Sequence, residues 1–285
     1  MHNSFRFGKI LFFSLILILL TIAMTMTENT KRTPEHHLEN GTFVNTNGTA
    51  NNKKLKELWK WMTGKKESKA IPIEFEMVDP DLKLINQDKS FSITWIGHAS
   101  FLYQNKELNI LTDPHLTNRA SPINFAGPQR YTKPAMKFEE LPRIDFVTIS
   151  HNHYDHLDLR TVKWIAKNNP DAMFLVPLGL KKWFLDKSIN NVIELDWWES
   201  HIINDTKITF TPVQHWSSRT LFDRNQTLWG GWHIKNNYHS LIHLGDTGYS
   251  DDFKETFKKL GPVDLALIPI GAVSYTHLTL PTMLW

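Results

Sequence analysis

The chain has 285 residues, enough for one substantial domain with extensions, and 41% of them are apolar, so a sizeable core can be buried. The formal net charge of +3 is mild and the basic residues are scattered along the chain, which argues against a nucleic-acid partner. The absence of cysteine excludes disulfides, thiolate zinc sites and a cysteine nucleophile, so any metal ion must be bound by histidines and carboxylates.

Residues 1–27 are predicted to be a signal-anchor or a signal peptide. The apolar run Ile10–Met24 carries no charge and is just long enough to cross a bilayer core of about 30 Å. No clear small-x-small cleavage site follows, which favours an uncleaved anchor over a cleaved peptide or a buried helix. Basic residues before the run favour a cytoplasmic N-terminus, although Lys31 and Arg32 weaken that asymmetry. We therefore expect a membrane-associated protein, and one compatible arrangement is single-pass with the domain in the secretory lumen.

Residues 28–54 are predicted to be a polar, disordered linker, because they are rich in Asn, Thr, Glu and His with almost nothing apolar. Asn-x-Thr triplets begin at Asn40, Asn47, Asn204 and Asn225. They could carry glycans if the chain enters the secretory lumen, but such triplets are common by chance and support that location only weakly.

Residues 55–89 are predicted to be an N-terminal extension of the domain. Within it, Leu55–Lys66 has apolar residues at helical spacing and lysines on the opposite face. Such a helix could lie at a membrane interface or pack on the domain, and the sequence favours neither.

Residues 90–272 read as a globular domain in which strand-like runs alternate with helical patterns. The first three strands suggest an antiparallel meander, and Asp158 is expected to be the N-cap residue of the helix that follows it. The strand-like runs are FSITWI, SFLYQ, LNILTD, IDFVTIS, MFLVP, NVIELD, KITFTPV, LWGGWHI and SLIHLGD, and the helical patterns are DLRTVKWIAKNN, LGLKKWFLDK and DDFKETFKKL. This alternation predicts a layered α/β domain with helices on the outside.

The stretch HNHYDHLD, residues 151–158, follows a buried strand and is rich in metal-ligating side chains. In an extended loop, His151 and His153 point to the same side and can bind one ion. Asp155 and His156 lie just beyond and can reach a second ion. The alternative is a solvated polar loop, which fits poorly with the apolar strand directly before it.

Two later strands also end at a possible ligand. KITFTPVQHW ends near His215, and SLIHLGDTGY near Asp246. Each has a structural alternative, since His215 could be a hydrogen-bonded core histidine and Asp246 a turn residue between two glycines. Because both follow the same strand-then-ligand pattern as the HNHYDHLD loop, we favour a shared metal site.

Together these motifs resemble the metallo-β-lactamase superfamily, and a series of blocks resembles the N-acyl-phosphatidylethanolamine-hydrolysing phospholipase D family. The similarity runs from Trp95 to Ala272 and extends more weakly back to Leu55. The blocks, in order, are GHASFL, LTDP, RASP, GPQRY, ELPRIDFVTISHNHYDHLD, VPLGL, VIELDWWE, FTPVQHWSSRTL, LWGGW, GDTGY and DLALIPIGA. The resemblance implies an α/β fold, the αββα sandwich of that superfamily.

The resemblance also implies two zinc ions (Zn2+) and a substrate in the membrane. The implied ligands are His151, His153 and His215 for one zinc, Asp155 and His156 for the second, and Asp246 between them. A water activated by the ions would attack the phosphorus of N-acyl-phosphatidylethanolamine, releasing an N-acylethanolamine and phosphatidic acid, with Asp155 and Asp246 at the catalytic centre. The implied partners are a membrane phospholipid and the bilayer, not nucleic acid, and the sequence does not show an oligomeric state.

Other matching residues are implied to support the site. His98 and Asp113 would orient ligands or loops, although His98 beside a glycine could simply be a turn residue. For Arg119, Arg130 and the segment Asp196–Glu199, a role in stabilising the fold is favoured over contact with lipid. Ser217, where the family has a cysteine, is not expected to touch the metals.

The resemblance stops at Ala272. Residues 273–285 match nothing in the family, which continues with a segment whose histidine completes the second zinc site, and His277 has no matching surroundings. We therefore expect an incomplete domain and a tail that is foreign to the family, so that the chain as written is unstable or inactive.

Two alternative functions remain open from sequence. One is another dinuclear-zinc hydrolase, acting on a lactone or a soluble phosphodiester. The other is an inactive lipid-binding fragment that lacks the last zinc ligand.

Overall fold

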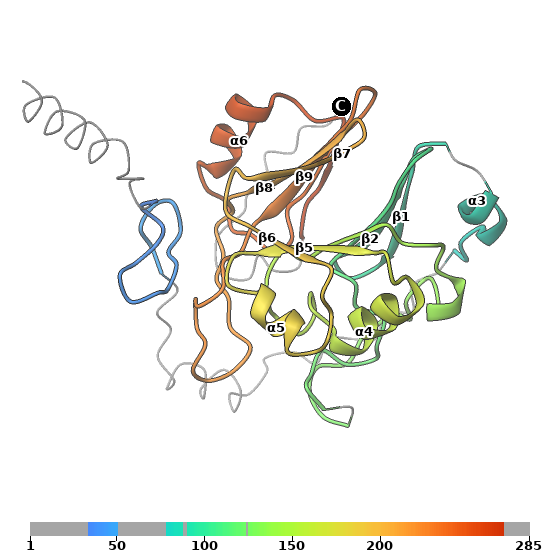
Figure 1. Cartoon of the computed structure of the whole chain (residues 1–285), viewed down its shortest axis with the longest axis horizontal. Coiled ribbons are helices and arrows are strands. Elements are labelled where there is room, and N and C mark those ends of the chain that lie inside the picture. The colour runs from blue at the N-terminus through green and yellow to red at the C-terminus, as the bar shows by residue number, and fades with distance from the viewer. Residues whose placement is uncertain (1–33, 51–77, 88–89, 124, 271–285) are drawn as a thin grey trace, which may run out of the picture. The chain divides into compact units, whose positions relative to one another are not determined.

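The computed structural model describes residues 34–50, 78–87, 90–123 and 125–270. The chain divides into two compact units, Met1–His37 and Leu38–Trp285. The described part of the first unit is a short turn in which the His37 N–H donates to the Pro34 carbonyl at 2.9 Å. All described helices and strands belong to the second unit (Figure 1).

The first sheet of the second unit has six strands in sequence order, β1-β2-β3-β4-β5-β6. The strands are β1 (Ser92–Gly97), β2 (Ser100–Gln104), β3 (Asn109–Thr112), β4 (Phe146–Thr148), β5 (Met173–Pro177) and β6 (Val192–Leu195). The first three are antiparallel, as the meander pattern predicts, and β3 to β6 pair in parallel. Parallel strands place their carboxyl ends at one edge, so β3 and β4 both deliver their following loops to the same side.

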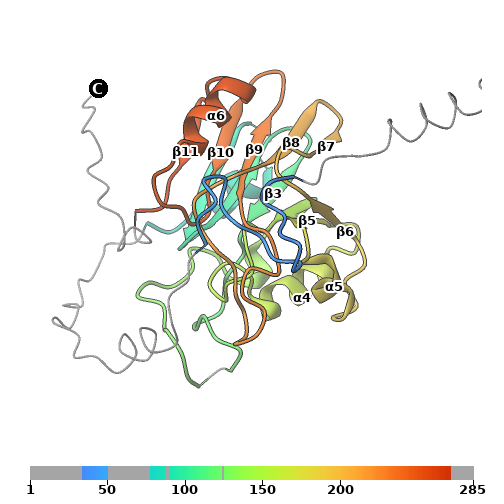
Figure 2. The same cartoon turned by 90° about the vertical axis from the view of Figure 1, so that its left-hand side faces the viewer.

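The second sheet has five strands in the order β11-β10-β9-β8-β7. The strands are β7 (Ser200–Ile203), β8 (Thr206–Thr211), β9 (Gly231–Lys235), β10 (Ser240–His243) and β11 (Leu265–Leu267). All neighbours are antiparallel except β10 and β11. The two sheets face each other, as the side views show (Figure 2).

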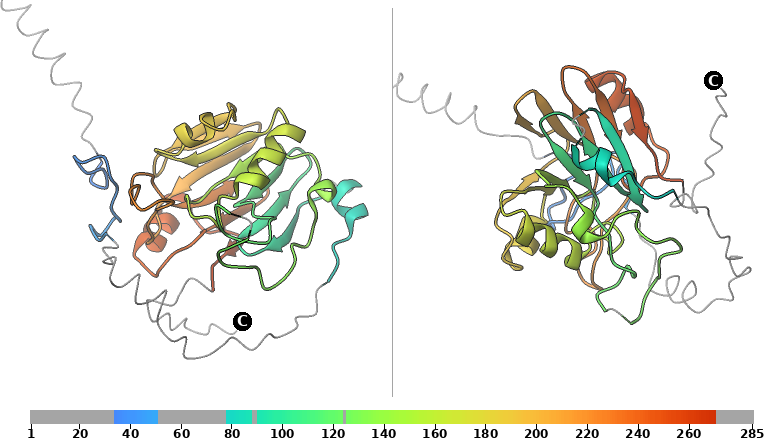
Figure 3. Two further views of the ribbon diagram at one scale, coloured as in Figure 1. Left: turned by 90° about the horizontal axis from the view of Figure 1, so that it is seen from below. Right: turned by 90° about the vertical axis from the view of Figure 1, so that its right-hand side faces the viewer.

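Helices cover the outer faces of both sheets. They are α3 (Leu82–Gln87), α4 (Leu159–Asn168), α5 (Lys181–Leu185) and α6 (Asp252–Leu260), with a 3-10 turn η1 at Phe138–Glu140. Helices α4 and α5 lie across the first sheet and α6 lies beside the second (Figures 1 and 3). As predicted, Asp158 caps α4, since its carboxylate accepts from the Arg160 N–H at 3.2 Å. The layered α/β sandwich with outer helices is therefore confirmed.

Two apolar clusters form the core because side chains alternate along each strand. On β4, Val147 packs under the helices and Phe146 packs between the sheets. The inter-sheet cluster includes Phe210 and Trp232, whose ring centroids are 4.6 Å apart and which are both fully buried. Burying a side chain of this size contributes about 1.5–3 kcal/mol. These rigid layers fix the strand ends from which the site is built.

Part of the segment expected to be a solvated linker is folded onto the domain. In residues 38–50, Phe43, Val44 and Asn45 are buried, at 8%, 8% and 4% exposure. The Phe43 N–H donates to the Asn225 carbonyl at 2.8 Å. The segment differs from a solvated linker because Phe43 packs into the inter-sheet apolar cluster and Val44 beside it is also buried.

Several predictions fall outside the described residues. They are the apolar run Ile10–Met24, the amphipathic stretch Leu55–Lys66 and the tail 273–285. Where the structure is described, no helix is both long and apolar enough to span a bilayer.

Candidate metal centre

The HNHYDHLD loop begins where β4 ends. The Trp232 indole N–H donates to the Ile149 carbonyl at 3.0 Å, and the Gly230 N–H donates to the Ser150 carbonyl at 3.0 Å, so the second sheet fixes the start of the loop. One tight turn then forms, in which the Leu157 N–H donates to the His153 carbonyl at 2.9 Å. The loop therefore starts from β4 of the first sheet and is hydrogen-bonded to the second sheet at that point.

One set of candidate ligands, the first ligand group, comprises His151, His153, His215 and Asp246. One possible ligand atom from each lies within 4.8 Å of the others. The Nε2 of His215 is 3.2 Å from His151 Nε2 and 3.3 Å from His153 Nδ1. In a tetrahedral site with metal–nitrogen distances of about 2.0–2.1 Å, ligand atoms lie about 3.3 Å apart. The structure thus brings the four predicted residues together at a spacing that suits one metal ion.

A second set, the second ligand group, comprises His98, Asp155 and His156. Asp155 Oδ2 is 3.0 Å from His98 Nε2 and 3.7 Å from His156 Nε2. His98 was expected only to orient other groups, but its ring nitrogen lies among the possible ligand atoms. It reaches this position because its backbone adopts φ 53°, an uncommon left-handed conformation for a non-glycine residue.

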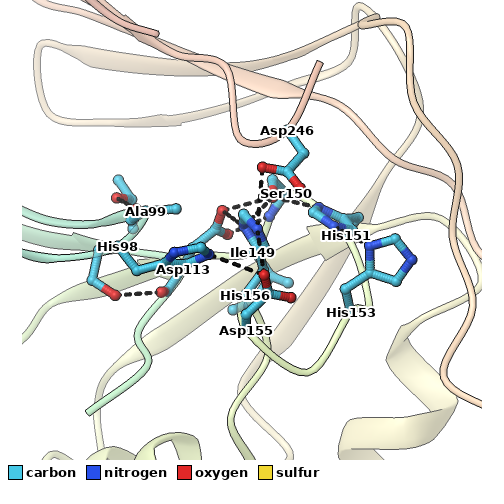
Figure 4. A network of polar contacts seen from close by, with 12 residues as sticks. His98, Ala99, Asp113, Ile149, Ser150, His151, His153, Asp155, His156 and Asp246 are labelled. Atoms are coloured by element: carbon cyan, nitrogen blue, oxygen red, sulfur yellow. Dashed lines mark hydrogen bonds and ion pairs between the residues drawn. The ribbon is translucent and has the colours of Figure 1, made fainter. Parts of the chain in front are cut away.

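Asp246 faces both ligand groups. Its Oδ1 is 3.4 Å from His156 Nε2, and its Oδ2 is 3.8 Å from His215 Nε2. Figure 4 shows Asp246 descending from the second sheet onto histidines that rise from the HNHYDHLD loop. One carboxylate oxygen is directed to each group, which is the arrangement of a bridging ligand.

Asp113 joins the loop after β3 to the loop after β4. It is completely buried and accepts from the Ser150 N–H at 2.6 Å, from the Ser150 hydroxyl at 2.6 Å and from His156 Nδ1 at 2.8 Å. Its bond to His156 leaves Nε2 of that ring directed at the ligand groups. Asp113 thus contacts a candidate ligand directly, and the orienting role that the resemblance implies for it stays a prediction.

Two further side chains at the site were not singled out from sequence. Ser150 donates to Asp113 and also lies 2.9 Å from His151 Nδ1. His243, at the end of β10, is 2% exposed, with Nε2 3.9 Å from Asp113 Oδ2. His243 lies three residues before Asp246, and this short spacing could have indicated from sequence that it belongs to the site. No sequence pattern marks Ser150.

The remaining candidates lie outside both ligand groups. Arg119 donates to the Gly127 carbonyl at 2.6 Å, and Arg130 donates to the His115 carbonyl at 2.6 Å, so both brace the loop after β3. Within Asp196–Glu199, the Trp197 indole donates to the Trp229 carbonyl at 2.6 Å. Ser217 donates its hydroxyl to the Thr227 carbonyl and is absent from both groups. In each case the side chain donates to a backbone carbonyl and so helps to fix the path of the chain.

Burial keeps the first-group histidines neutral. It lowers the pKa of His153 to about 3 and that of His215 to about 4, and it lowers the pKa of His151 well below its usual value. A neutral imidazole is the form that binds a metal ion. These three rings are therefore in the protonation state of metal ligands at neutral pH.

Interactions among Asp155, Asp246 and His156 shift the pKa of each group in the direction that favours its charged form. Burial alone would raise the pKa of Asp155 and of Asp246. His156 and its neighbours nevertheless hold both pKa values below the usual carboxylate range. Asp246, Asp155 and Asp113 in turn raise the pKa of His156 well above its usual value, against burial. Binding a metal at His156 would displace its proton.

The chemistry of these atoms fits a metal ion. His156 Nε2, which faces Asp155 and Asp246, is buried and has no hydrogen-bond partner among the described residues. Buried polar atoms are normally paired, so such atoms indicate a missing partner. Imidazole nitrogens together with carboxylate oxygens are ligands that zinc accepts.

A cavity of about 630 Å³ opens onto the second ligand group. Its polar part includes His98, Asp155 and Asp246, and its apolar wall includes Trp95 and Phe101. A volume of this size is typical of small-molecule sites. The candidate metal centre is therefore accessible to a ligand from the side of the second group.

The model of a family described as the beta-lactamase superfamily domain matches residues 108–283, more than half of the chain. The chain belongs to this superfamily. Its two facing sheets with outer helices are the metallo-β-lactamase fold, which confirms the fold expected from the resemblance.

Individual relatives confirm the narrower resemblance. The chain is 40% identical to N-acyl-phosphatidylethanolamine-hydrolyzing phospholipase D 1 of Caenorhabditis elegans, over 76% of this chain and 66% of that protein. It is 34% identical to the mitochondrial enzyme of the same name from Saccharomyces cerevisiae, over 72% of this chain and 46% of that protein. The chain thus spans about half to two thirds of the length of these relatives. Their names are those of hydrolases, in agreement with the enzyme class predicted from sequence.

A solved structure with a similar chain path is Igni18, a metallo hydrolase from Ignicoccus hospitalis. The similarity covers 59% of this chain and 65% of that one, at 20% identity and a TM-score of 0.45.

Proposed function

We propose that this chain is a zinc-dependent phosphodiesterase that hydrolyses N-acyl-phosphatidylethanolamine to an N-acylethanolamine and phosphatidic acid. The observation that carries the proposal is the pair of ligand groups that share Asp246 beside an open cavity. The nematode and yeast relatives are named for hydrolysis of this lipid, and they supply the substrate in the proposal.

The first ligand group would hold one zinc, and Asp155 and His156 of the second ligand group would hold another, with Asp246 between them. Paired zinc ions, when bound, lower the pKa of a water ligand and neutralise negative charge on phosphoryl oxygens. The burial of the first group and the 3.2 and 3.3 Å distances from His215 Nε2 to the nitrogens of His151 and His153 support a firmly held ion there.

Asp155 and Asp246 act in the proposal as ionised acceptors. Their pKa values lie below the usual carboxylate range because of the neighbouring histidines, so at neutral pH neither can donate a proton. Each can instead accept a hydrogen bond from the attacking water and fix its direction. His98, 3.0 Å from Asp155, holds that carboxylate in place.

The cavity provides a place for the lipid beside these groups. Its apolar wall continues from Trp95 and Phe101 to Leu267 and Ile270, while its polar part lies at Asp155. A phosphodiester at the polar part would leave an attached acyl chain against the apolar wall, where burial is favourable. A membrane phospholipid fits this division better than a small polar ester.

The test is turnover on vesicles that contain N-acyl-phosphatidylethanolamine, with both products measured by mass spectrometry. The zinc-loaded chain should release N-acylethanolamine and phosphatidic acid, lose this activity on chelation and regain it when zinc is restored. Asp246→Asn should reduce the rate by about 100-fold or more, because a charged group at the centre is neutralised.

Other outcomes would replace the proposal. Opening of a lactone, or cleavage of a soluble phosphodiester, without release of N-acylethanolamine would indicate a different dinuclear hydrolase. Vesicle binding that is unchanged by chelation, with no turnover, would indicate a lipid-binding protein instead.

A further inference from the structure

His215 lies on an irregular stretch of backbone. Strand β8 ends at Thr211, so the ladder that fixes β8 does not reach this ligand. The His215 N–H donates instead to the side-chain oxygen of Asn45 at 3.0 Å, across 170 positions of sequence. The backbone of a first-group ligand is thus anchored by a side chain from the 38–50 segment.

Asn45 is itself fixed by a closed set of hydrogen bonds. It is 4% exposed, and its Oδ1 also accepts from the Trp229 indole N–H at 3.0 Å. Its Nδ2 donates to the Thr49 carbonyl at 3.0 Å, and its backbone N–H donates to the same carbonyl at 3.1 Å. With its oxygen and its amide nitrogen both committed, the side chain has little freedom to turn away from His215.

Other residues of the 38–50 segment contact the two stretches of chain that carry His215 and Asp246. Gln214, beside His215, donates its side-chain amide to the Thr49 hydroxyl at 2.9 Å. Thr46 donates its hydroxyl to Asp252 at 2.6 Å, at the start of α6, just after the turn that follows Asp246. The Gly248 N–H donates to the Gln214 carbonyl at 2.8 Å and joins the two stretches.

We propose that Asn45 is a positioning residue for the metal centre, holding His215 in the geometry of the first ligand group. The inference rests on the proposed metal-dependent function, because it assumes that the group binds an ion. It gives the N-terminal segment a role in metal affinity that is separate from its packing. Partners that orient metal ligands typically alter metal affinity by about 10- to 100-fold when removed.

The test is Co2+ binding to the full chain, followed by the visible absorption of the ion and by competition with a chelator. Asn45→Leu conserves the volume approximately and removes the acceptor, so it should weaken binding by about 10-fold or more and change the spectrum. Asn45→Asp keeps an oxygen for the His215 and Trp229 N–H groups but loses the donor to Thr49. It should retain most of the affinity and the spectrum while lowering the unfolding temperature of the metal-free chain.

Thr46→Val is the matched control, since it breaks the contact with α6 and leaves Asn45 in place. It should leave Co2+ affinity and spectrum unchanged. The proposal is overturned if Asn45→Leu binds Co2+ as the wild type does, or if Asn45→Asp or Thr46→Val loses as much affinity. A wild-type chain that binds no Co2+ overturns this proposal and the proposed function together. A chain that binds Co2+ with the expected pattern but does not cleave the lipid overturns the proposed substrate alone.

Discussion

The two ligand groups share one carboxylate but differ in burial. In the first group, His151 is 1% exposed, and the side chains of His215 and Asp246 are 13% and 18% exposed. In the second, the side chains of His98 and Asp155 are 45% and 37% exposed, and only His156 is completely buried. The first group is enclosed by the two sheets, whereas the second forms part of a cavity wall.

This difference suggests a division of roles. Zinc sites that only stabilise a fold are closed, and sites that perform chemistry keep an accessible position. The first group takes ligands from three separate stretches of chain, so an ion there also ties the sheets together. The second group faces the cavity, so an ion there would be the more exposed to substrate and the more easily lost.

The largest effect should follow removal of a first-group ligand. His153→Ala removes one nitrogen from the four-residue set, so tight metal binding should fall by more than the roughly 100-fold that loss of an orienting partner causes. Isothermal titration with zinc measures this. The control is His201→Ala, on β7 outside both groups. Tight binding that survives in the His153 variant would show that the first group is not the principal site.

A smaller effect is expected at Asp113, whose buried carboxylate contacts Ser150 and His156. Asp113→Asn keeps the shape but weakens the acceptor for Ser150 and His156, so we expect metal affinity to fall by about 10- to 100-fold. Competition with a chromogenic chelator measures the change. Ser150→Ala, which removes one donor to Asp113, should have a lesser effect. The reverse order would mean that Ser150 is the main support.

The second group can be weakened without touching the first. His98→Ala should lower affinity for the second ion by about 10-fold and leave the first unchanged, because His98 contacts Asp155 and no first-group atom. Titration of metal-free protein with Co2+, resolved into two steps, distinguishes the ions. A loss of both steps would contradict two separable groups.

A buried histidine away from the site gives the smallest effect. Burial lowers the pKa of His233, on β9, to about 4 from an ordinary value of about 6.5. Between these values the unfolded chain binds the extra proton, so folding stability falls as pH drops through this window, by up to about 1.4 kcal/mol per pH unit. In the metal-free chain, His233→Leu should reduce the slope by this amount and leave the part that comes from the buried histidines of the first ligand group. Urea unfolding at several pH values from 7 to 4 measures it, and equal slopes in both proteins would refute the assignment.

Sequence patterns predicted the strand ends well because each one is marked by residues that are adjacent in the sequence. An apolar run followed at once by polar ligands marks β4 and its loop, and the same pattern marks the stretches that end at His215 and Asp246. In the structure, alternation along β4 places Phe146 and Val147 in different apolar clusters. The resemblance then supplied the layer order, which periodicity alone could not determine.

What was missed depends on contacts between residues distant in sequence. Asn45 lies in a polar segment with no periodicity, and nothing near it indicates a partner at His215. The position of His98 among the possible ligand atoms depends on a left-handed backbone conformation that no local pattern indicates. Ser150 has an ordinary position at a strand end, and only the buried carboxylate of Asp113 makes it part of the site.

Equilibrium dialysis of the metal-free chain against zinc tests the central claim most directly. Two ligand groups of unequal burial predict one tightly bound zinc per chain and a second, weaker one, with the weaker step lost in His98→Ala. Binding of no zinc, or of two zinc ions with equal high affinity, would contradict this account of the centre.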